Sequence, residues 1–154
     1  MITNFYMPTR VVAGPGALGT IGTLARDLKM SRVLVVSDPV ISRQPFHADA
    51  LAALAEAGIA ASRFDECGID ARCSHIDDQG GRVRREGIDG VVCVGGGSVM
   101  CTGKGIAIVA TNNKPMARLN AMLNKPGIMK LWLKMNLPIL VEPVVSKSIA
   151  AIIG

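Results

Sequence analysis

Three consecutive glycines followed by a serine are the residues of this chain best suited to hold a phosphate. They are Gly95, Gly96, Gly97 and Ser98, and they separate an apolar run at residues 89–94 from a segment that is compatible with a helix. This order predicts strand, tight loop and helix. Helix N-termini present free N–H groups to anions, and glycine has no Cβ to keep a pyrophosphate away from the backbone. We therefore predict pyrophosphate contacts at these four residues, with Ser98 also able to cap the helix.

A carboxylate, Asp38, follows a second apolar run, Arg32–Val36, which predicts a strand buried on both faces. At the end of such a strand, a carboxylate can accept hydrogen bonds from the ribose hydroxyls of a dinucleotide. It would repel a 2′-phosphate, so NAD is favoured over NADP. The alternative is a turn-forming aspartate in front of Pro39.

The remaining residues with reactive side chains form no pattern that indicates catalysis or metal binding. The cysteines lack a C-x-x-C pair, so four reduced thiols are expected, and both histidines are expected at the surface. We predict no catalytic residue and no metal ligand in this chain. Lys104 either supports the phosphate site or is solvated. The residues concerned are Cys67, Cys73, Cys93, Cys101, His47 and His75.

These residues need a scaffold, and the pattern of the chain predicts an α/β fold with a doubly wound, mostly parallel sheet. The 154 residues suffice for one domain, and 49% of them are hydrophobic while only 3% are aromatic. Such a composition suits a Val- and Ile-rich sheet covered by Ala-rich helices. Strands are predicted at residues 11–13, 32–36, 59–64 and 89–94, and helices at residues 17–29, 45–57, 71–87 and 98–110.

The alternating pattern fades after Thr111. Residues 137–141 are a candidate strand, but Pro138 and Pro143 flank it and predict an edge position or no strand. The apolar stretch at residues 131–153 also fits a face built to pack against a partner. We expect a dinucleotide-binding domain over residues 1–113 and a divergent extension of it over residues 114–154.

Three segments resemble the iron-containing alcohol dehydrogenase family. The run from Gly95 to Lys104 resembles its GGGS-x-x-D-x-x-K signature, residues 5–17 its opening strand and glycine turn, and residues 32–39 its first nucleotide-binding strand. The resemblance runs from about Phe5 to about Asn113. It implies a Rossmann-like fold, of the type found in the N-terminal domain of dehydroquinate synthase, and an NAD site at Asp38 and the glycine loop.

The resemblance also implies what the complete family enzyme does. It would interconvert an alcohol and an aldehyde or ketone by hydride transfer to NAD, with iron or zinc held by an aspartate and three histidines of a helical domain. That domain is expected to be absent here. Cys101 replaces the signature aspartate, as a small filler or a redox-sensitive thiol, and Gly103 replaces the usual alanine. Val144 and Val145 stand where the family has threonines. We expect dinucleotide binding without turnover; the alternative is an inactive remnant or a protein-interaction module.

Charge and hydropathy narrow the partners. The net charge is +5, but the lysines are dispersed and aromatic residues are few, so no nucleic-acid partner is expected. No secretory signal and no long apolar run is recognised, so a cytoplasmic protein without a membrane span is expected. Apart from the dinucleotide, possible partners are a second copy of the chain or another chain that supplies the metal domain.

Overall fold

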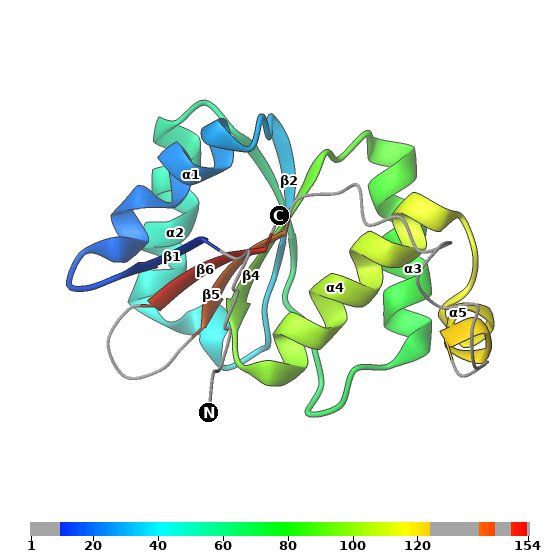
Figure 1. Ribbon diagram of the computed structural model, residues 1–154. Helices are drawn as coiled ribbons and strands as arrows, with labels where there is room; N and C mark the ends of the chain where they lie inside the picture. The colour runs from blue at the N-terminus through cyan, green and yellow to red at the C-terminus, as the bar shows by residue number, and fades with distance from the viewer. Residues whose placement is uncertain (1–9, 124–138, 144–148, 154) are drawn as a thin grey trace, which may run out of the picture.

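The computed structural model describes residues 10–123, 139–143 and 149–153, and its centre is a six-stranded sheet in the order β1-β6-β5-β4-β2-β3 (Figure 1). The pairs β5–β4, β4–β2 and β2–β3 are parallel, and β6 is antiparallel to both of its neighbours. The predicted mostly parallel sheet is confirmed. The strands are β1 (Arg10–Ala13), β2 (Arg32–Val36), β3 (Ala60–Phe64), β4 (Gly90–Gly95), β5 (Ile139–Pro143) and β6 (Ile149–Ile153).

Helices cover both faces of the sheet, as the doubly wound prediction requires. In Figure 1, α1 and α2 lie on one side and α3, α4 and α5 on the other. Successive residues of a strand point to opposite faces, so Val33 and Val35 pack with α1 and α2, whereas Leu34 and Val36 pack with α3 and α4. The helices are the 3₁₀ helix η1 (Ala17–Thr20), α1 (Ile21–Asp27), the 3₁₀ helix η2 (Ile41–Arg43), α2 (Pro45–Glu56), α3 (Cys73–Glu86), α4 (Gly97–Asn112) and α5 (Met116–Leu123).

Glycines let α3 and α4 approach each other closely. A Cβ at Gly80 would stand 2.5 Å from the Val109 side chain, and a Cβ at Gly105 would stand 2.7 Å from the Ile76 side chain. A larger residue at either place would push the helices apart, because packed interiors hold few voids. The two helices therefore form one layer over the sheet.

The predicted elements up to Ala110 are all present, with shifts at their ends. The helix expected at residues 17–29 begins as the 3₁₀ turn η1 and ends at Asp27. Gly16 in front of it has a φ of 82°, and Lys29 behind it has a φ of 61°. Both residues are in the left-handed region, which cannot continue a right-handed helix.

The prediction that prolines exclude residues 137–141 from the sheet interior is wrong. β5 lies between β4 and β6, and a further strand, β6, lies beyond it. Pro143 is the last residue of β5 and pairs with Gly95 at the end of the β4–β5 ladder. Its missing N–H therefore removes no hydrogen bond from the interior of the sheet. β5 and β6 thus account for part of the apolar stretch at residues 131–153. The rest of this stretch, which includes Pro138, Val144 and Val145, lies outside the described residues.

Candidate functional site

A pocket of about 510 Å³ opens at the carboxyl ends of three parallel strands. β2 leads to α2 on one face of the sheet and β4 leads to α4 on the other, so the chain diverges between these neighbouring strands. Ligands of open α/β sheets bind at such a point. The pocket is lined by Asp38, Pro39, Val40, Cys67, Gly68, Ile69, Gly96, Gly97, Ser98 and Val99.

The structure brings four of the five predicted site residues into this pocket, namely Asp38, Gly96, Gly97 and Ser98. Gly95 is not among the lining residues. It is the buried last residue of β4, and a Cβ there would stand 2.6 Å from the Val99 side chain. Its observed place is therefore one of close packing beneath the start of α4.

The glycine loop leaves space and donors for an anion. Gly96 is the N-cap of α4, without a side-chain cap, and the first hydrogen bond of the helix runs from Met100 N–H to Gly96 O at 3.0 Å. In the part of the chain that the structure describes, the N–H groups of Gly97, Ser98 and Val99 have no acceptor. A Cβ at Gly96 or Gly97 would meet nothing within 4 Å. Free N–H groups in open space at a helix N-terminus are the geometry of a phosphate site.

Ser98 has a different role from the predicted cap. It is the second residue of α4, and its hydroxyl donates to the carbonyl oxygen of Ile69 in the loop between β3 and α3. The capping prediction fails because Gly96 already occupies the N-cap position with extended backbone. The Ser98–Ile69 hydrogen bond joins two walls of the pocket.

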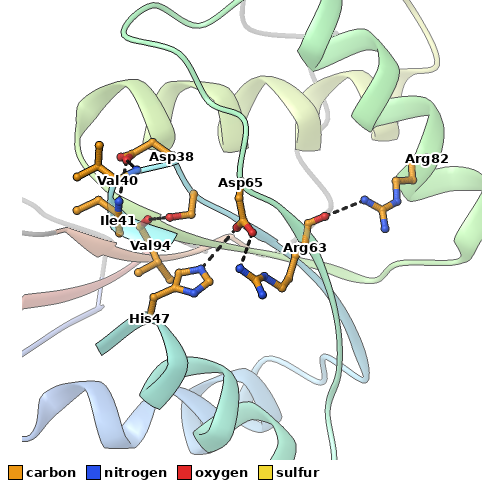
Figure 2. A network of polar contacts seen from close by, with 9 residues as sticks. Asp38, Val40, Ile41, His47, Arg63, Asp65, Arg82 and Val94 are labelled. Atoms are coloured by element: carbon orange, nitrogen blue, oxygen red, sulfur yellow. Dashed lines mark hydrogen bonds and ion pairs between the residues drawn. The ribbon is translucent and has the colours of Figure 1, made fainter. Parts of the chain in front are cut away.

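Asp38 forms the turn that was one of its two predicted roles, and it also lines the pocket. Its Oδ1 accepts hydrogen bonds from the N–H groups of Val40 and Ile41, both at 2.9 Å, so the carboxylate forms the turn after β2 (Figure 2). Its Oδ2 has no hydrogen-bond partner within the described ranges, and the residue lines the pocket. One oxygen thus holds the turn while the other is available to a ligand.

A buried serine beneath the pocket fixes the spacing of its loops. The Ser37 hydroxyl donates to Val94 O at 2.8 Å, and Ser37 N–H donates to Phe64 O at 2.8 Å. Ser37 O in turn accepts from Cys67 N–H at 3.2 Å. The ends of β2, β3 and β4 are therefore tied through one fully buried residue.

Two apolar residues at the pocket were not predicted from the sequence. Val40 is 68% exposed and Ile69 is 92% exposed, although both are large hydrophobic residues. They come from the loops after β2 and β3. The signal that could have found them is their place in the chain, just beyond two predicted strands, where apolar residues have no core to fill.

The prediction that His47 lies at the surface is wrong. It is 1% exposed and faces Asp65, with its Nε2 atom 3.7 Å from Asp65 Oδ1, too far for a hydrogen bond (Figure 2). Neither atom has a hydrogen-bond partner in the described structure. Burial lowers the pKa of His47, and Arg63 lowers it further, whereas Asp65 acts in the opposite direction. The spacing of His47, Ala50 and Leu54 along α2 could have indicated this burial.

Asp65 also links His47 to a network of polar contacts through its second carboxylate oxygen, Oδ2. Arg63 pairs with Asp65 Oδ2 at 2.6 Å, and the Arg63 carbonyl oxygen accepts from Arg82 at 2.9 Å (Figure 2). Arg82 belongs to α3, so the network crosses from α2 to the far helix layer around the edge strand β3. It contacts none of the predicted site residues.

The four cysteines divide into two groups, and all of them are free. Cys67 and Cys93 are buried, and burial raises their pKa values to about 11 and about 12. Cys73 and Cys101 are exposed and line a separate pocket of about 340 Å³. Cys101 is thus absent from the wall of the Asp38 pocket.

Metal ligands do not gather in the part of the chain that the structure describes. No group of three or more His, Cys, Asp or Glu side chains is placed there to hold an ion. His75 contacts the edge of the Phe64 ring, with centroids 5.7 Å apart. Within the same residues, no helix is both long and apolar enough to cross a bilayer.

The sequence matches the family model of iron-containing alcohol dehydrogenases over residues 8–145. It is 28% identical over 111 residues to an NAD-dependent methanol dehydrogenase of Bacillus methanolicus, a match that covers 72% of this chain and 29% of that protein. It is 32% identical over 109 residues to a choline dehydrogenase of Bacillus subtilis, covering 71% of this chain and 27% of the relative.

Solved structures show the same architecture. An iron-containing alcohol dehydrogenase from Thermotoga maritima superposes with a TM-score of 0.76 at 28% identity, over 95% of this chain and 39% of that one. An NADH-dependent butanol dehydrogenase from the same organism gives a TM-score of 0.79 at 23% identity, over 94% of this chain and 35% of its own. The chain spans less than a third of the two sequence relatives named above.

Proposed function

Because the chain belongs to the iron-containing alcohol dehydrogenase family, we propose that the Asp38 pocket binds an NAD dinucleotide. The observation that carries this proposal is the open glycine loop at the N-terminus of α4. Gly96 and Gly97 have empty space where a Cβ would stand, and three N–H groups there lack acceptors in the described structure. A pyrophosphate supplies the negative oxygen atoms that such groups bind.

The other walls of the pocket suit the adenosine half of the dinucleotide. The unpaired Oδ2 of Asp38 accepts hydrogen bonds from the ribose hydroxyls and repels a 2′-phosphate. Val40 and Ile69 offer exposed apolar surface from the loops after β2 and β3, against which the adenine ring packs. The hydrogen bond from Ser98 to Ile69 O holds the loop after β3 against the start of α4.

The activity proposed for the complete family protein is dehydrogenation of an alcohol, with NAD as the hydride acceptor. Two relatives bear such names, an NAD-dependent methanol dehydrogenase and an NADH-dependent butanol dehydrogenase. In the described part of this chain, no three or more His, Cys, Asp or Glu side chains gather to hold an ion, so these residues do not fit the iron or zinc of that chemistry. The proposal for this chain is therefore dinucleotide binding, with no step that involves a metal.

A pair of glycine-to-alanine variants tests the proposal. Gly97→Ala places a methyl group in open space where the phosphate is expected, and the backbone there has no positive φ. We expect native stability and a loss of NAD affinity of about tenfold or more, which corresponds to about 1.4 kcal/mol. Gly19→Ala is the matched control, because its Cβ also meets nothing within 4 Å and it lies in η1, outside the pocket. Equal NAD affinity in both variants would contradict the assigned phosphate site.

A further inference from the structure

The helices α3 and α4 lie next to each other on one face of the sheet (Figure 1). The Ser98 hydroxyl bonds to Ile69 O in the loop before α3, and these residues are 29 positions apart in the chain. The close approach of Gly105 in α4 to the Ile76 side chain in α3 has the same offset of 29 positions.

The close approach of Gly80 in α3 to the Val109 side chain in α4 is a third contact with this offset of 29 positions. Contacts at one offset mean that the two helices run in the same direction and that residues 29 positions apart lie at the same level. The same offset places Cys101 at the level of Arg72, and Cys73 at the level of Thr102. The two cysteines are therefore at nearly the same level of the two helices.

Both thiols open into the same space. Cys73 is the first residue of α3, Cys101 lies in the first turns of α4, and both are exposed. They line one pocket of about 340 Å³ together with Lys104. The other two cysteines are buried, and their raised pKa values make them poor nucleophiles.

We propose that Cys73 and Cys101 form a redox-active dithiol that reacts with small disulfides. One protein thiolate attacks a sulfur of the disulfide, whose S–S bond breaks and releases one small thiolate. This leaves a mixed disulfide between the first cysteine and the small molecule. The second protein thiolate then attacks the sulfur of that first cysteine, forms the Cys73–Cys101 bond and expels the second small thiolate. The dithiol loses two electrons, the small disulfide gains them, and the protons of the two protein thiols pass to the two released thiolates.

The cross-link would join the first turns of α3 and α4, directly beyond the Ser98–Ile69 hydrogen bond. Because it constrains the unfolded chain, oxidation should raise the thermal midpoint of unfolding. The inference does not depend on dinucleotide binding, since neither cysteine lines the Asp38 pocket.

The test is to incubate the full folded chain with oxidised glutathione and to follow the intact mass. We expect a product that lacks two hydrogen atoms relative to the reduced chain and carries no glutathione. A non-reducing peptide map should join the peptides of Cys73 and Cys101. Cys73→Ser should stop at a stable glutathione adduct on Cys101, and Cys101→Ser should stop at an adduct on Cys73. Both positions are exposed, so the variants should keep the native circular dichroism.

Four outcomes would overturn the proposal. They are two stable adducts on one chain without a cross-link, a bond from Cys101 to Cys67, dimers joined between chains, and no reaction of the folded protein. The double variant Cys73→Ser with Cys101→Ser is the negative control, because it lacks both thiols of the proposed dithiol. It should remain unmodified under conditions that convert the native chain.

Discussion

The sulfur of Cys93 in β4 occupies the space that a β-carbon at position 103 of α4 would need. Both residues are buried, so the helix lies on the strand with a thiol fitted into the gap left by glycine. From the sequence, Gly103 predicts only the propensity cost of a glycine inside a helix. The structure adds that its lack of a side chain is matched to one residue of the sheet.

The first prediction concerns this pair. Gly103→Ala should destabilise the protein, because overpacking costs about 1–3 kcal/mol while better helix propensity returns about 1 kcal/mol. In a Cys93→Ala background the clash is relieved, and the same change should become neutral or stabilising. Urea denaturation of the four proteins gives the coupling between the sites. An equal effect of Gly103→Ala in both backgrounds would show that the two residues do not compete for space.

The second prediction separates the two roles of Asp38. Asparagine keeps an oxygen for the N–H groups of Val40 and Ile41, whereas alanine removes it. We expect Asp38→Ala to lose about 1 kcal/mol of stability and Asp38→Asn to unfold like the native chain. Both should lose about tenfold or more in NAD affinity, as hydrogen bonds to a charged group are worth about 1.5–3 kcal/mol.

Asp38→Asn should also narrow the preference for NAD over NADP, because the neutral amide no longer repels a 2′-phosphate. Titration of both dinucleotides into the two variants measures these effects. If Asp38→Asn bound NAD as tightly as the native chain, the carboxylate would be a turn residue alone.

The third prediction follows from the buried His47. Burial lowers its pKa in the folded state below the ordinary value of 6.5. The unfolded chain therefore binds a proton more readily, and stability should fall as the pH drops below about 6.5. Above that pH both states are neutral at this residue, and no effect is expected.

His47→Gln removes this titration. The gap in unfolding free energy between the native chain and the variant should shrink as the pH falls from about 7 to about 5. Denaturation at several pH values measures the gap directly. Two curves that stay parallel across this range would mean that His47 takes up its proton equally well in both states.

The local parts of the fold could be predicted from the sequence, and the long-range parts could not. The apolar run of β2 and the glycine loop before α4 depend on neighbouring residues and were predicted correctly. β6 pairs with β1 from the other end of the chain, and a five-residue strand that contains two alanines gives little local signal. The interior place of β5 likewise depends on β6 beside it rather than on the prolines in and next to residues 137–141.

The candidate site follows the same division. The types of Asp38, Gly96 and Gly97 indicate their chemistry directly, and the parallel sheet brings them to one edge. The bond of Ser98 to Ile69 depends on a loop from another strand, which no spacing in the sequence reveals. The burial of His47 was missed, although the spacing of His47, Ala50 and Leu54 along α2 could have indicated it.

The central claim is that the Asp38 pocket binds a dinucleotide and prefers NAD. The most direct measurement is a calorimetric titration of NAD and of NADP into the purified chain, once circular dichroism has shown that it is folded. We predict saturable binding of NAD and weaker binding of NADP. A folded chain that binds neither, or that binds NADP as tightly as NAD, would contradict the account.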